Sequence, residues 1–187
     1  MVTMERQELI SAEQFFEIAA LPENEDKRLE LEEGMIVEMA GSKPINTVTA
    51  ARLVYFINAV VIPNDLGYVT GADGIFQLDA HTARIPDVAF VSKTRLAEGI
   101  PPRFTFAPDL AVELVSPDED VFRKAREYLR AGAKAVWAVY TEDKIISVFS
   151  AVSETEFRVK EYGIDDTLTA PDILPGFALP VRDIFPA

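Results

Sequence analysis

Two apolar stretches of the sequence are each interrupted by one carboxylate. Residues 84–91 (RIPDVAFV) carry Asp87 near their start, and residues 110–115 (LAVELV) carry Glu113 near their centre. Both stretches have the composition of β-strands, and a strand that buries a carboxylate without a partner is destabilised. If the two strands are neighbours, the acids can converge on a hard divalent cation such as Mg²⁺ or Mn²⁺, which binds through oxygen ligands. A metal held in this way activates water beside a phosphate group.

Each acid also has an ordinary structural interpretation. Asp87 follows Pro86, and turns or strand edges often carry an acid at such a position. Glu113 can face solvent from a half-exposed strand, although Ala111 and Val115 lie on the same side of that strand and are apolar. Neither residue alone decides between a structural and a chemical role. The occurrence of both in one chain favours a metal site.

A lysine follows the second acid on the next expected helix. Lys124 and Tyr128 are four residues apart and share a helix face, whereas Ala125 and Leu129 belong to the apolar side. A lysine beside a metal-bound water can orient the nucleophile or stabilise negative charge that develops on a phosphate. The alternative is a solvated lysine paired with Asp120 one turn earlier, and the residues alone favour this second interpretation.

Hydrophobic spacing and turn residues predict the elements that position these side chains. Ser11 and Gln14 form the pattern of a capping box, and Ser116 followed by Pro117 resembles a second helix start. We expect helices over 11–20, 45–62 and 116–131, a hairpin of 28–31 with 35–39, and strands over 68–70, 74–78, 85–91, 110–115, 135–140, 145–149 and 157–161. This order predicts one α/β domain, residues 1–187, with helices packed on a mixed β-sheet.

Composition excludes several classes of protein. The 31 Asp and Glu residues exceed the 18 Lys and Arg residues, and the formal charge of −13 excludes a basic nucleic-acid coat protein. The absence of cysteine excludes disulfides, thiolate metal sites and cysteine nucleophiles. We expect a cytoplasmic protein without a membrane span, because the start lacks a signal-peptide pattern and the apolar stretches are short. His81 is expected on a surface loop and Trp137 in the core.

Five segments together resemble a known family. They are Arg28–Gly34 with Glu38 and Met39, Arg84–Val91, Ala107–Pro117, Lys124–Gly132 with Val136 and Trp137, and Leu174–Phe177. In this order and at this spacing they are similar to the Uma2 family (DUF820) of restriction-endonuclease-like proteins, within the PD-(D/E)XK nuclease superfamily. The resemblance implies a restriction-endonuclease-like core, with the N-terminal hairpin and helices flanking a mixed sheet.

The resemblance also assigns roles to the candidate residues. It implies a metal-dependent phosphodiesterase site with Asp87 and Glu113 as metal ligands and Glu30 as a supporting acid from the hairpin. The superfamily usually has a lysine two residues after the strand glutamate, where this chain has Val115. In this family that lysine is expected on the following helix, and Lys124 matches the position. The resemblance therefore makes Lys124 a catalytic candidate.

Three further residues are expected to contact the substrate, namely Arg84, Asn46 and Tyr128, with Tyr128 also placed to fix Lys124. Two departures from the family pattern affect the site. Asn46 stands where many relatives have a histidine, and the segment between Pro117 and Lys124 is shorter than expected.

The leading hypothesis is a Mg²⁺-dependent endonuclease that acts on DNA as a homodimer, the dimer being implied by the resemblance. The charge of −13 opposes DNA binding, although Arg123, Lys124, Arg126 and Arg130 on one helix could form a basic rim. One alternative is a catalytically inactive nuclease fold that binds protein or nucleic acid. Another is a metal-dependent hydrolase with a substrate other than duplex DNA.

Overall fold

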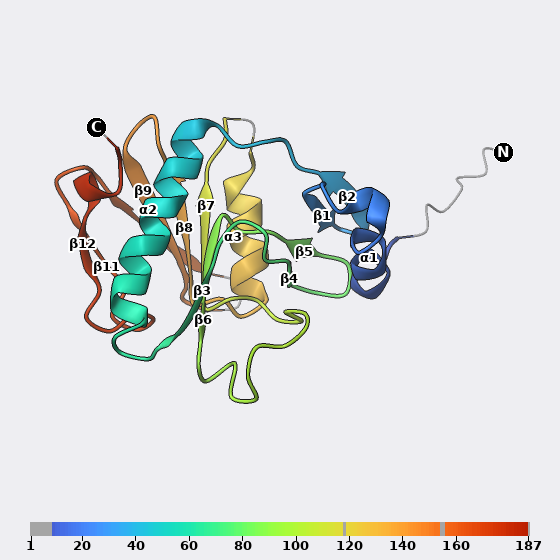
Figure 1. Ribbon diagram of the computed structural model, residues 1–187. Helices are drawn as coiled ribbons and strands as arrows, with labels where there is room; N and C mark the ends of the chain where they lie inside the picture. The colour runs from blue at the N-terminus through green and yellow to red at the C-terminus, as the bar shows by residue number, and fades with distance from the viewer. Residues whose placement is uncertain (1–8, 118, 154–155, 187) are drawn as a thin grey trace.

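The computed structural model describes residues 9–117, 119–153 and 156–186. The helices are α1 (Ala12–Ala19), α2 (Pro44–Val61) and α3 (Val121–Arg130), with 3₁₀ helices η1 (Pro22–Asn24) and η2 (Val181–Asp183). The strands are β1 (Leu29–Glu32), β2 (Met35–Glu38), β3 (Gly67–Thr70), β4 (Phe76–Gln77), β5 (Ala83–Arg84), β6 (Val88–Ser92), β7 (Leu110–Leu114), β8 (Ala135–Tyr140), β9 (Ile145–Ala151), β10 (Phe157–Tyr162), β11 (Thr167–Thr169) and β12 (Ala178–Pro180). Their arrangement is shown in Figure 1.

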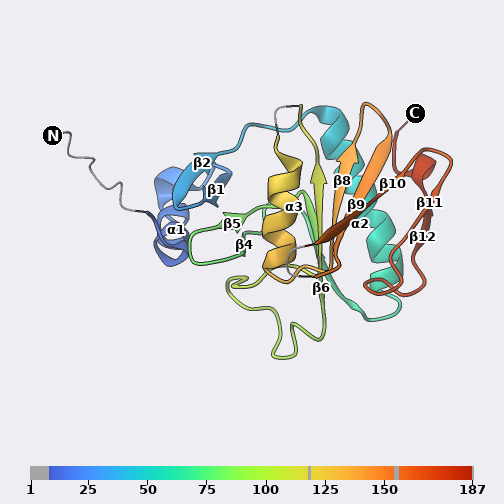
Figure 2. The same cartoon turned by 180° about the vertical axis from the view of Figure 1, so that it is seen from behind.

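Within the described residues, the strands form a six-stranded sheet, a four-stranded sheet and a two-stranded sheet. The larger sheet has the order β10-β9-β8-β7-β6-β3, and β7 and β8 are its parallel pair, joined through α3. Helix α2 covers one face of this sheet and α3 the other, as the two opposite views show (Figures 1 and 2). The structure confirms the predicted α/β architecture with a mixed sheet.

Alternation along β7 directs its side chains to two different layers. Leu110, Val112 and Leu114 belong to the cluster packed under α2, together with Trp137, which is core as predicted. Ala111 belongs to the cluster under α3. Glu113 lies on the same side of the strand as Ala111, opposite a second small residue, Ala138 of β8. These alanines leave room under α3 for polar side chains.

The smaller sheet, β2-β1-β5-β4, holds the N-terminal hairpin. Glu33 and Gly34 link β1 to β2 with φ angles of 47° and 83°, the positive values that a two-residue type I′ turn requires. Leu29 and Leu31 of β1 pack with α1 in a separate apolar cluster. Alternation then turns Glu30 to the opposite side, toward the larger sheet. The predicted hairpin and the capping box of α1 are both confirmed.

Two predicted elements differ from the structure. The strand expected over 85–91 begins only at Val88, as β6 of the larger sheet. Ala83 and Arg84, before the expected range, form β5 of the smaller sheet, and Pro86, which lacks an N–H group, lies in the crossing between the two strands. The helix expected from Ser116 begins instead at Val121, because Asp120 is its N-cap and accepts a hydrogen bond from the Arg123 amide at 3.0 Å. Asp118, also part of that predicted start, lies outside the described residues.

Helix α2 is long and apolar enough to cross a membrane by length and composition, and no other helix of the described residues meets that test. The apolar segment is therefore longer than the short apolar stretches that the sequence led us to expect. Leu53, Ile57 and Val61 on one side of α2 are completely buried against the larger sheet. This packing is that of a core helix in a globular domain.

Candidate active site: an acidic cleft around Lys124

Asp87 and Glu113 lie side by side, as the sequence predicts. Asp87 directly precedes β6, which is the antiparallel neighbour of β7. The pairing of Val88 with Val112 continues by one position to place Asp87 next to Glu113. The Asp87 Oδ2 atom accepts a hydrogen bond from the Leu114 amide at 2.8 Å, which holds this carboxylate against β7.

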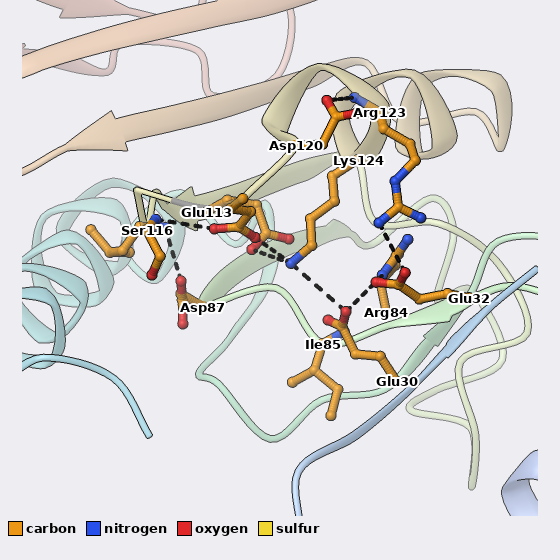
Figure 3. Close-up of polar contacts among 12 residues, drawn as sticks. Glu30, Glu32, Arg84, Ile85, Asp87, Glu113, Ser116, Asp120, Arg123 and Lys124 are labelled. Carbon is orange, nitrogen blue, oxygen red and sulfur yellow. Dashed lines mark hydrogen bonds and ion pairs between the residues drawn. The ribbon is translucent and has the colours of Figure 1, made fainter. Parts of the chain in front are cut away.

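Lys124 is buried between carboxylates from three parts of the chain. Its Nζ atom lies 2.5 Å from Glu119 Oε1. It also lies 3.5 Å from Glu113 Oε2 and 3.7 Å from Glu30 Oε2, and Figure 3 shows these two partners. The interpretation as a solvated lysine paired with Asp120 is wrong, because Asp120 caps α3 and Lys124 is only 4% exposed. The alternative of a solvent-facing Glu113 is wrong for the same reason, since Glu113 is 3% exposed.

Glu30 reaches this cluster from the smaller sheet, where the hairpin prediction placed it. Its Oε1 atom accepts the Ile85 amide at 2.9 Å, and its Oε2 atom accepts Arg84 Nη1 at 2.8 Å. Arg84 also pairs with Glu32, and with Glu127 at 2.7 Å. The Arg84 side chain is completely buried, so in this conformation it has no surface with which to contact a substrate. Arg84 therefore has a structural role, because its ion pairs join the N-terminal hairpin to α3.

The other two expected substrate contacts are also occupied by partners within the chain. The Tyr128 hydroxyl donates a hydrogen bond to Glu113 Oε1 at 2.8 Å, so it positions Glu113 rather than Lys124. Tyr128 is completely buried. Asn46 is 4% exposed, and its Oδ1 atom accepts a hydrogen bond from the Thr141 hydroxyl at 2.8 Å.

The cluster opens into a cleft of about 320 Å³ between the two sheets. Asp87, Glu113 and Lys124 line it together with residues of β1, of the 39–42 loop and of the start of α3. A second hollow of about 280 Å³, which includes Asn46, shares Ser116 and Glu119 with this cleft. The cleft therefore joins every catalytic candidate, and Asn46 borders the adjoining hollow.

Comparison with known families agrees with this architecture. The Uma2 family, described as "Putative restriction endonuclease", matches residues 12–182. The chain belongs to the Uma2 family. The crystal structure of a "putative nuclease belonging to DUF820" from Anabaena variabilis ATCC 29413 has the same fold, with a TM-score of 0.79 and 22% identity over 94% of this chain and 97% of that chain. No curated protein matches the sequence.

In this Uma2 chain, burial and mutual repulsion oppose ionisation of the paired acids. Burial, together with the charges of Glu30, Asp87 and Glu119, raises the pKa of Glu113 to about 8, and the nearby Lys124 only partly offsets this. Burial also raises the pKa of Asp87, against the opposing effects of the Leu114 amide and of Arg28. The cleft thus contains more negative charge than its cations neutralise.

Lys124 keeps its proton. Burial acts to lower the pKa of this lysine, but the carboxylates of Glu113, Glu30 and Glu119 outweigh burial and raise it. The ammonium group is therefore a fixed positive charge and a hydrogen-bond donor. It is not a general base near neutral pH.

The donor set fits a hard cation with few protein ligands. Among the described residues, no group of three or more His, Cys, Asp or Glu side chains is arranged to hold a metal ion. Asp87 and Glu113 provide two carboxylates in an open cleft, and Mg²⁺ is commonly bound by one or two carboxylates while it keeps several waters. A divalent cation would also favour the ionised form of both acids, against the burial and the repulsion that raise their pKa values.

Two features of the site differ from the sequence prediction or were missed by it. Glu119, which we read as part of the helix start, is the nearest partner of Lys124. The expected basic rim on α3 is reduced to Arg126 and Arg130, because Lys124 is buried and Arg123 pairs with Glu32 at 2.9 Å. The presence of a lysine five residues after Glu119 was the only sequence signal for that contact.

The raised pKa of Glu113 predicts a pH-dependent effect of Glu113→Gln on stability. The folded state binds the Glu113 proton more tightly than the unfolded state does, so the protonated side chain stabilises the folded protein. This stabilisation is complete below the ordinary pKa of 4.5 and is lost as pH rises through about 8. We expect the melting temperature of Glu113→Gln, relative to wild type, to increase from pH 5 to pH 9 in the presence of a chelator. Thermal denaturation across this range measures it. A difference that does not change with pH would contradict the assignment.

Proposed function

We propose that this protein is a divalent-metal-dependent endonuclease that hydrolyses phosphodiester bonds in DNA. The observation that carries the proposal is the pairing of Asp87 and Glu113 in an open cleft beside a protonated Lys124. Membership of a family described as "Putative restriction endonuclease" supports the reaction class. Mg²⁺ or Mn²⁺ held by Asp87 and Glu113 would polarise a phosphate oxygen and lower the pKa of bound water.

The chain's own residues have distinct tasks in this reaction. The water oxygen forms a bond to phosphorus and its proton is released to solvent, while the bond to the leaving oxygen breaks and that oxygen takes up a proton from solvent. Lys124 donates hydrogen bonds to the attacking water or to the phosphate, where its positive charge stabilises the negative charge that develops. Tyr128 holds Glu113 in place, and Glu30 holds the backbone at Ile85, two residues before Asp87.

Arg28 is the cation best placed to bind the substrate phosphate. It lines the cleft, and its Nη2 atom lies 3.8 Å from Asp87 Oδ1. Its Nε atom is buried without a hydrogen-bond partner in the described part of the chain. The Arg28 side chain as a whole is 29% exposed, so its guanidinium group can reach a phosphate in the cleft and pair with two of its oxygens.

Calorimetric titration with Mg²⁺ and with Mn²⁺, followed by assay of the same samples on supercoiled plasmid DNA, tests the proposal. We expect stoichiometric metal binding and metal-dependent nicking. A parallel panel of single-stranded DNA, RNA and a small phosphodiester identifies the substrate. Metal binding with hydrolysis only of a non-DNA substrate would contradict the DNA assignment. The absence of metal binding would leave the alternative of a catalytically inactive nuclease fold.

A further inference from the structure

Helix α2 is apolar on its outer side as well as on the side packed against the sheet. Val48, Tyr55 and Ile62 are 47%, 68% and 70% exposed, and Ala51 and Ala59 between them are also exposed. These five residues, here called the α2 stripe, recur every three or four positions and so follow one side of the helix. In Figure 1 this helix lies on the outside of the larger sheet. Exposed apolar side chains that follow one side of a helix indicate an interaction site.

The α2 stripe is symmetric in sequence about Tyr55. An alanine lies four residues before Tyr55 and another four residues after it, and a β-branched aliphatic residue lies seven residues away on each side. If two such helices pack antiparallel about a two-fold axis, Tyr55 meets its own copy, Ala51 faces Ala59, and Val48 faces Ile62. A two-fold interface requires a patch that is complementary to itself, and the α2 stripe has this property. The alanines leave space for the partner's tyrosine ring.

Charge favours the same face. Two chains of charge −13 repel each other, so they can approach only where acidic groups are few. Residues 44–62 contain no acid and one base, Arg52, whose Nε atom donates to the Asp183 carbonyl at 3.1 Å. A membrane surface is a poorer partner, because interfacial helices use Lys and Arg to contact anionic headgroups. The features of α2 therefore fit a second copy of this chain.

We propose that two copies of the protein associate through their α2 stripes, antiparallel, with the two-fold axis near Tyr55. This inference is independent of the proposed nuclease reaction. It identifies the dimer-forming face from exposure, symmetry and charge, and its tests do not require catalytic activity.

Cysteine cross-linking tests the geometry, because the chain contains no cysteine. We expect Tyr55→Cys to form a disulfide-linked dimer on mild oxidation. Val48→Cys alone should not form a disulfide. In the proposed dimer each position 48 faces position 62 of the other copy, so the two copies of position 48 are about 21 Å apart along the helix axis. That distance far exceeds the Cα separation of about 7 Å that a disulfide tolerates. A mixture of Val48→Cys and Ile62→Cys chains should cross-link.

Ile100→Cys serves as the matched control, since Ile100 is 63% exposed in the loop between β6 and β7. Cross-linking of Ile100→Cys as strongly as Tyr55→Cys would show random collision and would overturn the proposal. Efficient cross-linking of Val48→Cys with itself would overturn the antiparallel arrangement.

Light scattering across a concentration series tests the association itself. Wild type should approach twice its chain mass of 20.7 kDa, and added salt should favour the dimer by screening the repulsion. Tyr55→Glu should raise the dissociation constant at least ~100-fold, because it buries two charges near the axis, whereas Ile100→Glu should not. A monomer at every concentration and salt would overturn the proposal. Flotation of wild type, but not of Tyr55→Glu, with phosphatidylcholine vesicles would identify a membrane as the occupant instead.

Discussion

Glu113→Gln is expected to reduce metal-dependent DNA nicking at least ~1000-fold, which corresponds to a loss of about 4 kcal/mol of transition-state stabilisation. The substitution removes the charge that would bind the cation but retains an oxygen that can accept the Tyr128 hydrogen bond. Asp87→Asn should reduce nicking to a similar extent, because it removes the other carboxylate charge. The new amide oxygen can still accept the hydrogen bond from the Leu114 amide, so the local structure is retained. Single-turnover nicking at high Mg²⁺ concentration measures the chemical step.

The matched control is Glu98→Gln, which makes the same chemical change at an exposed loop position. It should retain wild-type nicking. Calorimetry of the two cleft variants should show loss of Mg²⁺ binding, while circular dichroism should show an unchanged fold. Full nicking by Glu113→Gln, with normal metal affinity, would exclude the acidic pair as the catalytic centre.

Arg84→Met is expected to lower the free energy of unfolding by about 3–5 kcal/mol, because removal of one partner leaves buried charge uncompensated. The Arg84 side chain is completely buried and pairs with Glu30, Glu32 and Glu127, which come from the hairpin and from α3. Its loss would leave Glu30 with Lys124 as its nearest cation, at 3.7 Å. Urea denaturation measures the loss.

A second substitution separates buried charge from lost packing. Adding Glu30→Gln to Arg84→Met should recover part of the stability, since it removes the most buried of the unpaired acids. Arg182→Met, which removes an exposed partner of Asp165, should have a far smaller effect than Arg84→Met. Equal losses for the Arg84 and Arg182 variants would contradict the assignment of Arg84 as a structural centre of the site.

Much of the local structure was predictable because it depends on residues close together in sequence. The Ser11 and Gln14 capping box, the Glu33-Gly34 turn and the apolar strands β7 and β8 each form from short-range patterns. The same holds for the candidate acids. A carboxylate within an apolar strand was sufficient to single out Glu113, and it is buried in the cleft beside Asp87 as the pattern predicted.

The residue at which α3 begins was not predictable from the sequence, because two residues compete as its N-cap. Ser116 and Asp120 are both good N-caps, and α3 begins after Asp120, which moves Glu119 out of the helix and toward Lys124. The choice between the two caps depends on where α3 packs against the larger sheet, which is a tertiary property and not one of the local sequence.

Only the tertiary structure decided the partners of the charged residues. Lys124 contacts acids from β1, β7 and the segment before α3, and Arg84 joins the hairpin to Glu127 across 43 positions of sequence. Sequence spacing suggested a pairing with Asp120 for Lys124, because local patterns describe neighbours within one element, and Arg84 was expected to contact the substrate. Burial reverses both predictions: once two sheets and a helix enclose these cations, the free-energy cost of an unpaired charge selects the nearest carboxylates, whichever elements carry them.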